Sequence, residues 1–171
     1  MQILDPSGHP MMSDEEMGII NRLLRENDCE RCLEWGSGNS TVWFPKENPF
    51  IDRWYSVEHN KTYLELLDSK IDDRRVTIDV FPEKDDYVNA PVSFGGKFDF
   101  ILVDGQWRPE CVDTAFEVAN TGAVILLHDC LWEKLAGVMD KYANRVKILA
   151  KGEKLMPNGF YNHRGLALFE A

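Results

Sequence analysis

The chain reads Leu33-Glu34-Trp35-Gly36-Ser37-Gly38-Asn39-Ser40-Thr41 where a short apolar run meets a glycine-rich turn. The run Arg31–Trp35 predicts a buried strand, and the two glycines allow the backbone to turn tightly and to approach a ligand closely. Ser40 or Thr41 can cap a following helix, whose N-terminus favours a carboxylate or a phosphate. A plain strand-to-helix turn is the alternative. The third glycine of the dinucleotide-binding motif is missing, because Thr41 stands in its place.

An alternation of strands and helices continues on both sides of this turn. Upstream, Ser13 and Glu16 form a capping-box pattern before apolar residues at helical spacing. Downstream, strands are expected over 54–57, 75–81, 98–103, 123–127, 146–149 and 165–169, and helices after Asn60, from Pro109 and over 131–142. Residues 83–97 show little helical periodicity and are not assigned to a helix.

This alternation predicts an α/β fold, a doubly wound and mostly parallel sheet of seven strands. Only a loop separates the last two strands, so they are expected to pair antiparallel at one edge of the sheet. The length of 171 residues fits a single domain over 1–171, with residues 1–28 as an N-terminal helical extension.

The charge and the apolar content of the chain disfavour two classes of partner, nucleic acids and membranes. The 19 Lys and Arg residues against 29 Asp and Glu residues give a net charge of −10. Binding to nucleic acid phosphates or to anionic membranes needs basic side chains, so neither is expected as a partner. No apolar run is long enough to cross a bilayer, and the first residues do not resemble a signal peptide.

The four cysteines favour a cytoplasmic protein with reduced thiols. Cys29 and Cys32 form half of a zinc-binding pattern, but no second pair completes it, so a structural zinc ion is not expected.

Residues that end strands are the candidates for chemistry, because ligands of open α/β sheets bind at the carboxyl ends of the strands. Glu58 ends the second strand and could accept hydrogen bonds from both hydroxyls of a ribose. Asp104 ends the fourth strand and could orient a substrate, hold a metal ion or take a proton. Arg108 could pair with Asp104 or bind a substrate carboxylate, and Trp107 could line a pocket. For each acid, a solvated turn residue is the alternative.

His128 and Asp129 follow the fifth strand. A histidine is the usual general base near neutral pH, and an aspartate beside it could join Asp104 in binding Mg²⁺. The alternative is a capping aspartate beside a histidine held by hydrogen bonds.

The order of these motifs resembles the class I S-adenosylmethionine-dependent methyltransferases. The stretches 33–41 and Ser56-Val57-Glu58-His59 are especially similar to a bacterial subgroup of that family, and the likeness runs from Ser13 to the C-terminus. The resemblance implies a Rossmann-like methyltransferase fold and S-adenosylmethionine as cofactor. It places the cofactor against the following residues: Glu34, Gly36, Ser37, Gly38, Ser40, Thr41, Glu58, His59 and Asp104.

The resemblance also implies methyl transfer to a small or medium-sized acceptor, with oxygen favoured over nitrogen. Asp104, His128 and Asp129 would be the catalytic residues, and Trp107 and Arg108 would bind the acceptor. In cation-dependent relatives two acids comparable to Asp104 and Asp129 bind a divalent ion. No third ligand follows Asp129 here, so no metal is predicted. The short connections suggest an open site or closure by a second subunit in a homodimer.

Two other functions remain open at this point. One is a catalytically inactive protein that keeps the fold and binds the cofactor without transferring a methyl group. The other is a nucleotide-cofactor oxidoreductase, since a strand, a glycine turn and a ribose-binding acid are common to both classes. The missing third glycine disfavours the oxidoreductase.

Overall fold

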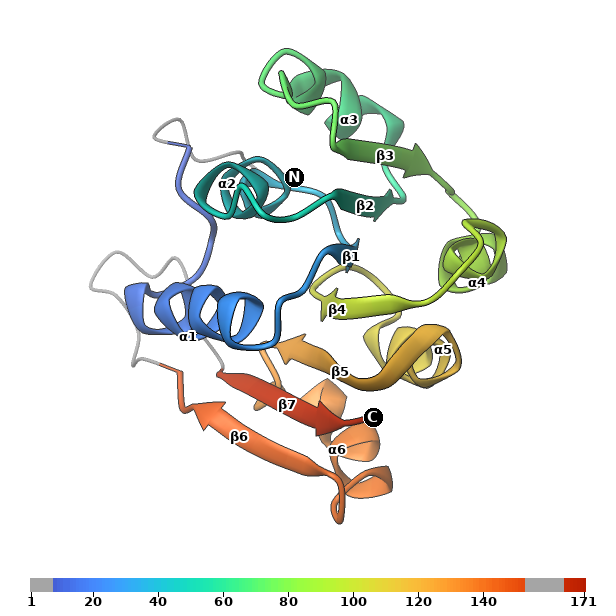
Figure 1. The fold of residues 1–171 in the computed structure, drawn as a ribbon. Helices are drawn as coiled ribbons and strands as arrows, with labels where there is room; N and C mark the ends of the chain where they lie inside the picture. The colour runs from blue at the N-terminus through green and yellow to red at the C-terminus, as the bar shows by residue number, and fades with distance from the viewer. Residues whose placement is uncertain (1–7, 153–164) are drawn as a thin grey trace, which may run out of the picture.

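Seven strands in the described part of the chain form one sheet in the order β3-β2-β1-β4-β5-β7-β6 (Figure 1). The computed structural model describes residues 8–152 and 165–171. The strands are β1 (Arg31–Trp35), β2 (Arg53–Glu58), β3 (Val76–Val80), β4 (Phe98–Val103), β5 (Ala119–His128), β6 (Val146–Ala150) and β7 (Leu166–Glu170). Strands β1 to β5 are parallel, whereas β7 runs antiparallel to both β5 and β6.

Helices cover both faces of the sheet (Figure 1). Their bounds are α1 (Asp14–Glu26), α2 (Asn39–Glu47), α3 (Lys61–Asp68), α4 (Lys84–Ser93), α5 (Arg108–Val118) and α6 (Ala136–Lys141), with a short 3₁₀ turn at Glu133–Leu135 before α6. Helices α1 and α2 pack on one face, and α4, α5 and α6 pack on the other.

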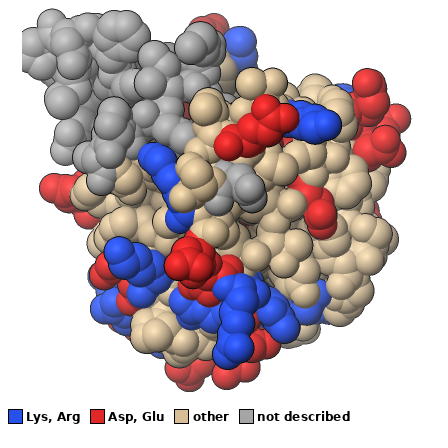
Figure 2. Space-filling view, turned by 90° about the horizontal axis from the view of Figure 1, so that it is seen from above, with Lys and Arg blue, Asp and Glu red and all other residues tan. Residues whose placement is uncertain are grey.

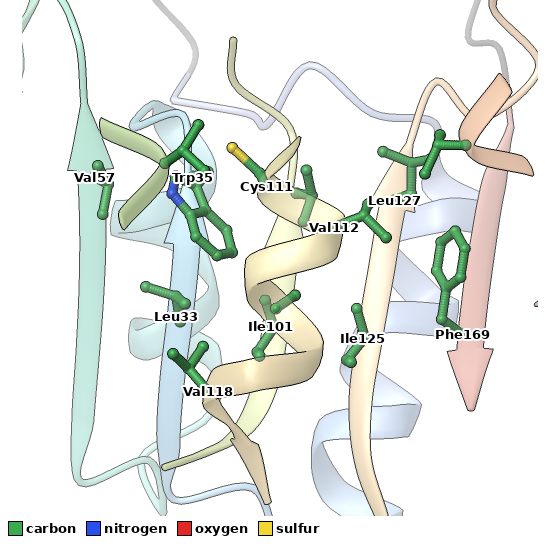
Figure 3. Close-up of a cluster of buried hydrophobic side chains, with 14 of the residues drawn as sticks. Leu33, Trp35, Val57, Ile101, Cys111, Val112, Val118, Ile125, Leu127 and Phe169 are labelled. Atoms are coloured by element: carbon green, nitrogen blue, oxygen red, sulfur yellow. The ribbon is translucent and has the colours of Figure 1, made fainter. Parts of the chain in front are cut away.

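The two faces of the sheet form two hydrophobic cores because successive strand residues point to opposite sides. On the α5 side, helix α5 lies across β1, β4 and β5 (Figure 3). That core includes Leu33, Trp35, Val57, Ile101, Val112, Ile125, Leu127 and Phe169, all with no exposed side-chain surface. On the α1 side, Ile20 and Leu24 of α1 pack against Trp54, Phe100 and Leu126. The same alternation directs Glu34 and His128 toward the α1 and α2 layer.

The predicted fold class is confirmed, with three local corrections. First, β7 is antiparallel as expected but lies between β5 and β6, so β6 rather than the C-terminal strand forms the edge. Second, residues 84–93 do form a helix, α4, because Tyr87, Val88 and Ala90 are buried against the sheet although they make no regular stripe. Third, the helix expected over 131–142 is shorter and begins with the 3₁₀ turn.

The surface charges, the cysteines and the helix lengths can be compared for the part of the chain that the structure describes. Lys and Arg side chains lie beside Asp and Glu side chains on the face shown in Figure 2. The four cysteines are free and buried. Among the described helices none is both long and apolar enough to cross a membrane.

Candidate functional site

The C-terminal ends of β1, β2, β4 and β5 meet at one edge of the sheet, because these strands are parallel. The strand order reverses between β1 and β4, which pair directly. Here Gly36 has a φ of +97°, and a Cβ atom on it would lie 2.6 Å from the Cα atom of Gly105. The turns after β1 and β4 therefore touch backbone to backbone at the switch point, where open α/β sheets bind ligands.

Gly38 differs from Gly36 both in its backbone conformation and in the space around its Cβ position. Its φ of −173° is an extended conformation that any residue adopts. A Cβ atom on Gly38 would meet the Tyr63 hydroxyl at 3.6 Å and the Ser40 Oγ at 3.8 Å, which are ordinary contacts. Neither the backbone nor the packing of the described residues requires a glycine at this position.

Glu34 supports the glycine turn from inside the protein. Its carboxylate accepts hydrogen bonds from the hydroxyls of Ser40 (2.5 Å), Thr41 (2.6 Å) and Ser56 (3.1 Å), and from the indole N–H of Trp54 (3.1 Å). The side chain is 0 % exposed. Burial raises the pKa of Glu34 to about 7, even though its four donors act in the opposite direction. Glu34 thus lies beneath the turn, where it positions the turn rather than facing a ligand.

The sequence suggested Ser40 or Thr41 as the N-cap of α2, but neither residue has that position. The N-cap of α2 is Gly38, so both residues lie inside the first turn of the helix. Thr41 Oγ1 accepts a hydrogen bond from the Gly38 amide at 2.9 Å while donating to Glu34. The two hydroxyls thereby fasten the start of α2 to the end of β1.

Glu58 joins the end of β2 to the same turn. Its Oε2 atom accepts a hydrogen bond from the Ser37 amide at 3.1 Å, and Oε1 accepts from the amides of His59 and Asn60, both at 2.8 Å. The Ser37 hydroxyl also pairs with Ser56 at 2.8 Å. Glu58 is 1 % exposed. The carboxylate is thus fixed by backbone N–H groups next to the turn, and its contact with a ribose stays a prediction.

Three aromatic rings lie around this edge of the sheet. His59 and Trp107 each meet Tyr87 edge to face, with ring centroids 6.2 and 5.3 Å from the Tyr87 ring. Trp107 has a left-handed backbone (φ 47°, ψ 39°), as does Asp129 (φ 56°). Such conformations are costly for residues other than glycine and gather at functional sites. Asp129 directly follows β5, and Trp107 is the N-cap of α5 in the turn between β4 and that helix.

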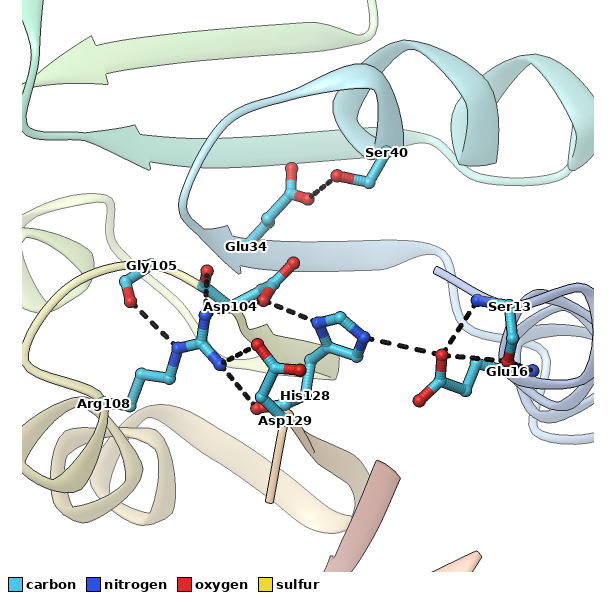
Figure 4. A network of polar contacts seen from close by, with 9 residues as sticks. All are labelled: Ser13, Glu16, Glu34, Ser40, Asp104, Gly105, Arg108, His128 and Asp129. Carbon is cyan, nitrogen blue, oxygen red and sulfur yellow. Dashed lines mark hydrogen bonds and ion pairs between the residues drawn. The ribbon is translucent and has the colours of Figure 1, made fainter. Parts of the chain in front are cut away.

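A chain of charged groups crosses the ends of β4 and β5 (Figure 4). The His128 Nδ1 atom donates to Asp104 Oδ1 at 2.8 Å, and its Nε2 atom lies 3.6 Å from Glu16 Oε2. Glu16 is the third residue of α1 and is held by the amide (2.9 Å) and the hydroxyl (3.0 Å) of Ser13. The imidazole therefore lies between two carboxylates, one from α1 and one from the end of β4.

The distances between these groups explain the direction in which the pKa of each is shifted. Burial acts to lower the pKa of His128, but the charges and hydrogen bonds of Asp104 and Glu16 outweigh it and raise the pKa to about 10. Burial acts to raise the pKa of Glu16, but the contact with His128 acts to lower it, and the net effect is a pKa of about 2. The pKa of Asp104 also lies below its usual value, because the charges of His128 and Arg108 outweigh burial. His128 is thus an imidazolium at neutral pH and must lose a proton before it can act as the expected base.

Asp104, His128 and Asp129 also form a group that one metal ion could bridge, with ligand atoms within 4.8 Å of one another. The Arg108 guanidinium instead forms ion pairs with both carboxylates, 3.0 Å from Asp104 Oδ1 and 3.2 Å from Asp129 Oδ2. Its remaining N–H groups donate to the carbonyl oxygens of Asp104, Gly105 and His128. A divalent ion would have to displace this guanidinium and bind a deprotonated imidazole, so the arrangement does not fit a metal.

The contacts of Arg108 bear on the substrate role expected of it. Its guanidinium makes four hydrogen bonds, to Asp129 Oδ2 and to the carbonyl oxygens of Asp104, Gly105 and His128, and an ion pair with Asp104 Oδ1, so an acceptor would compete with these contacts. As arranged, Arg108 joins the ends of β4 and β5 to the start of α5. Its role toward a substrate, like that of Trp107, remains a prediction.

The structure brings the predicted residues to one edge of the sheet and adds two that the sequence did not indicate. Tyr87 lies in α4, where no regular pattern marked it. Glu16 was identified only as a helix cap. Its spacing of four residues from Ile20 places it on the buried stripe of α1, and an acid in that stripe is the signal that could have shown its second role.

The fold that this edge belongs to is that of the class I methyltransferases. The O-methyltransferase TomG from Streptomyces achromogenes, involved in tomaymycin synthesis and solved with S-adenosylmethionine, superposes with a TM-score of 0.71 at 21% identity, over 94% of this chain and 82% of TomG. An O-methyltransferase from Bacillus cereus in complex with S-adenosylhomocysteine gives 0.73 at 19% identity, over 93% and 82%. A precorrin-6y C5,15-methyltransferase from Geobacter metallireducens gives 0.68 at 15% identity, over 99% and 94%.

These likenesses establish the fold alone. No protein-family model matches the sequence, and neither does any curated protein sequence.

Proposed function

We propose that the protein transfers a methyl group from S-adenosylmethionine to a hydroxyl oxygen of a small or medium-sized acceptor. Two of the similar structures are O-methyltransferases solved with S-adenosylmethionine or S-adenosylhomocysteine. In this chain the corresponding edge of the sheet carries a glycine turn, a fixed acid after β2 and a charged cluster after β4 and β5. These features favour a cofactor site at the switch point.

Gly38 is the observation that carries the proposal. Gly36 is explained by the protein itself, because its φ is positive and the Gly105 backbone leaves no room for a Cβ atom. Gly38 has neither constraint and stands at the N-terminus of α2 beside the switch point, which favours close approach of a ligand as the reason for its missing side chain. The turn fits the cofactor by this criterion.

The residues that would hold the cofactor are the backbone of Gly36, Ser37 and Gly38, with Glu58 and His59 at the ribose. When bound, the cofactor supplies a methyl group activated by a positively charged sulfur. The carboxylates of Glu58 and Asp104 favour a cation at this edge of the sheet. The aromatic rings of His59, Tyr87 and Trp107 would limit access of water.

Asp104 is the residue we assign to the acceptor. Its Oδ1 atom contacts His128 and Arg108, whereas Oδ2 makes no hydrogen bond to another described residue, and the side chain is 20 % exposed. A carboxylate with a lowered pKa accepts a hydrogen bond well but a proton poorly. Asp104 would therefore align the acceptor hydroxyl, and acceptors that ionise readily, such as phenols, are favoured.

We expect Gly38→Ala to fold normally and to bind S-adenosylhomocysteine at least about tenfold more weakly than the wild type, because the added Cβ atom would occupy space used by the ligand. Isothermal titration calorimetry measures the affinity, and thermal unfolding checks the fold. The control is Gly18→Ala in α1, where a Cβ atom meets nothing within 4 Å. Equal affinities for Gly38→Ala and the control would contradict the role of Gly38, and no binding by the wild type would contradict the proposed function.

An inactive cofactor-binding protein is the second candidate, and one observation favours it. His128 is protonated, and Arg108 is held by four hydrogen bonds and by ion pairs with two aspartates, so neither is poised to act on an acceptor. Incubation with methyl-labelled S-adenosylmethionine and a panel of phenols, carboxylic acids and amines distinguishes the two candidates. Label transferred to any member supports the enzyme, whereas cofactor binding without transfer across the panel favours the inactive protein.

Further expectations concern partners and surroundings. We infer a homodimer, because the connections between the described elements are short and a second subunit would close the site beside them. Light scattering at micromolar concentration is expected to give twice the mass of the chain, and the mass of a single chain would contradict it.

Nucleic acid is not an expected partner of so acidic a protein. The free buried thiols fit a reducing compartment such as the cytoplasm.

A further inference from the structure

Glu16 performs a second task besides capping α1. Its carboxylate is 1 % exposed, which is rare for an acid unless a partner compensates the loss of water. The Ser13 amide and hydroxyl satisfy the cap, and the same Oε2 atom lies 3.6 Å from His128 Nε2. The sequence separation of 112 residues shows that this contact belongs to the tertiary structure and not to the helix.

We propose that Glu16 is a positioning residue, which acts through His128 to fix the orientation and the charge of Asp104 at the site. This inference rests on the proposed function, because it concerns the edge where the cofactor would bind. Within the described part of the chain, the Glu16 carboxylate contacts Ser13 and His128, and it reaches the site through His128. It acts by holding the imidazole with Nδ1 directed at Asp104 Oδ1, so that Oδ2 of Asp104 is the atom left for a ligand.

The charges around His128 determine the net charge that this part of the site presents to a ligand. Among the described residues, the acids that act on His128 are Glu16 from α1, Asp104 after β4 and Asp129 after β5, and Arg108 of α5 is paired with both aspartates. Three acids, one imidazolium and one guanidinium give these five groups a summed charge of −1 while His128 is protonated. A net negative charge attracts a positively charged sulfonium but has little effect on a neutral thioether.

Glu16→Gln is the test, because glutamine also serves at the third position of a capping box and removes only the charge. While His128 stays protonated, the net charge of the group becomes zero in this variant, and it returns to −1 when His128 loses its proton. We expect the midpoint of the His128 titration to fall by about one pH unit or more. NMR of the imidazole measures it without any ligand, and the spectrum of His128→Gln identifies the signal.

The binding experiment gives a second measurement. We expect S-adenosylmethionine to bind Glu16→Gln about threefold more weakly than the wild type at pH 6, and we expect the difference to shrink at pH 9, where the lowered His128 midpoint leaves the imidazole partly deprotonated in the variant. S-adenosylhomocysteine, which lacks the charge, is expected to bind both proteins equally at both pH values. Ser13→Ala is the matched control, because it removes the cap hydroxyl and leaves the charge of Glu16 in place. Its His128 midpoint and its cofactor preference should equal those of the wild type.

The NMR and binding results test the positioning role of Glu16 and the proposed function separately. An unchanged His128 midpoint in Glu16→Gln, or the same shift in Ser13→Ala, would overturn the positioning role. A shifted midpoint with unchanged S-adenosylmethionine affinity at pH 6 would show that Glu16 controls His128 but does not act on the site. Failure of the wild type to bind either ligand would refute the proposed function, and with it the effect of Glu16 on the cofactor, while the NMR titration still tests the coupling of Glu16 to His128.

Discussion

Gly36→Ala is expected to destabilise the protein by about 4 kcal/mol or more, a cost typical of strained backbone combined with overpacking. The φ of +97° disfavours any residue with a Cβ atom. The new atom would also lie 2.6 and 2.7 Å from the Cα and N atoms of Gly105. These are backbone atoms of the turn after β4, so they cannot turn aside as a flexible side chain would. The two turns at the switch point would have to separate.

Two matched variants divide this effect into its parts. Gly95 has a φ of +66° but open space around its Cβ position, so Gly95→Ala measures the conformational cost alone, about 1 kcal/mol. Gly38→Ala has neither cost and should be as stable as the wild type or slightly more so. Urea unfolding of the four proteins gives the comparison. A Gly36→Ala variant no less stable than Gly95→Ala would show that the two turns separate easily.

Glu34→Ala is expected to cost about 3–5 kcal/mol, because it leaves four buried donors without their shared acceptor and creates a cavity beneath the turn. Among these donors, Thr41 also fastens the Gly38 amide, and Ser56 also pairs with Ser37. The loss should therefore also disturb the cofactor turn. Urea unfolding measures the stability, and Ser69→Ala, which removes an exposed hydroxyl that donates weakly at 3.5 Å, is the control.

Glu34→Gln separates the charge from the hydrogen bonds. The pKa of Glu34 in the folded protein, about 7, lies above its ordinary value of 4.5, so folding favours the protonated form. The contribution of Glu34 to stability is therefore fully present below pH 4.5 and declines as the pH rises to 7. Relative to Glu34→Gln, the wild type should lose on the order of 2–3 kcal/mol across this interval. A difference that stays constant with pH would show that Glu34 is not protonated preferentially in the folded state.

The local patterns were sufficient for most of the fold. The strand periods, the capping box and the glycine turn predicted the parallel sheet with its antiparallel addition, because each pattern reflects a local geometry that neighbours along the chain can satisfy. Helix α4 was missed because its burial depends on contacts of Tyr87 and Val88 with distant residues and not on a regular stripe. The place of β7 inside the edge was missed because strand order is set by which pairings bury most surface, and sequence separation does not reveal it.

The same division holds within the candidate site. The sequence by itself determined which residues end the parallel strands, and therefore that Gly36, Glu58, Asp104 and His128 share one edge of the sheet. Only the tertiary structure decided what each of them contacts there. It placed Glu34 under the turn, paired Arg108 with Asp104 and Asp129, and set His128 between Asp104 and a capping acid 112 residues away. The physical reason is that burial and charge pairing depend on distances across the fold, whereas strand ends depend on the order of residues along the chain.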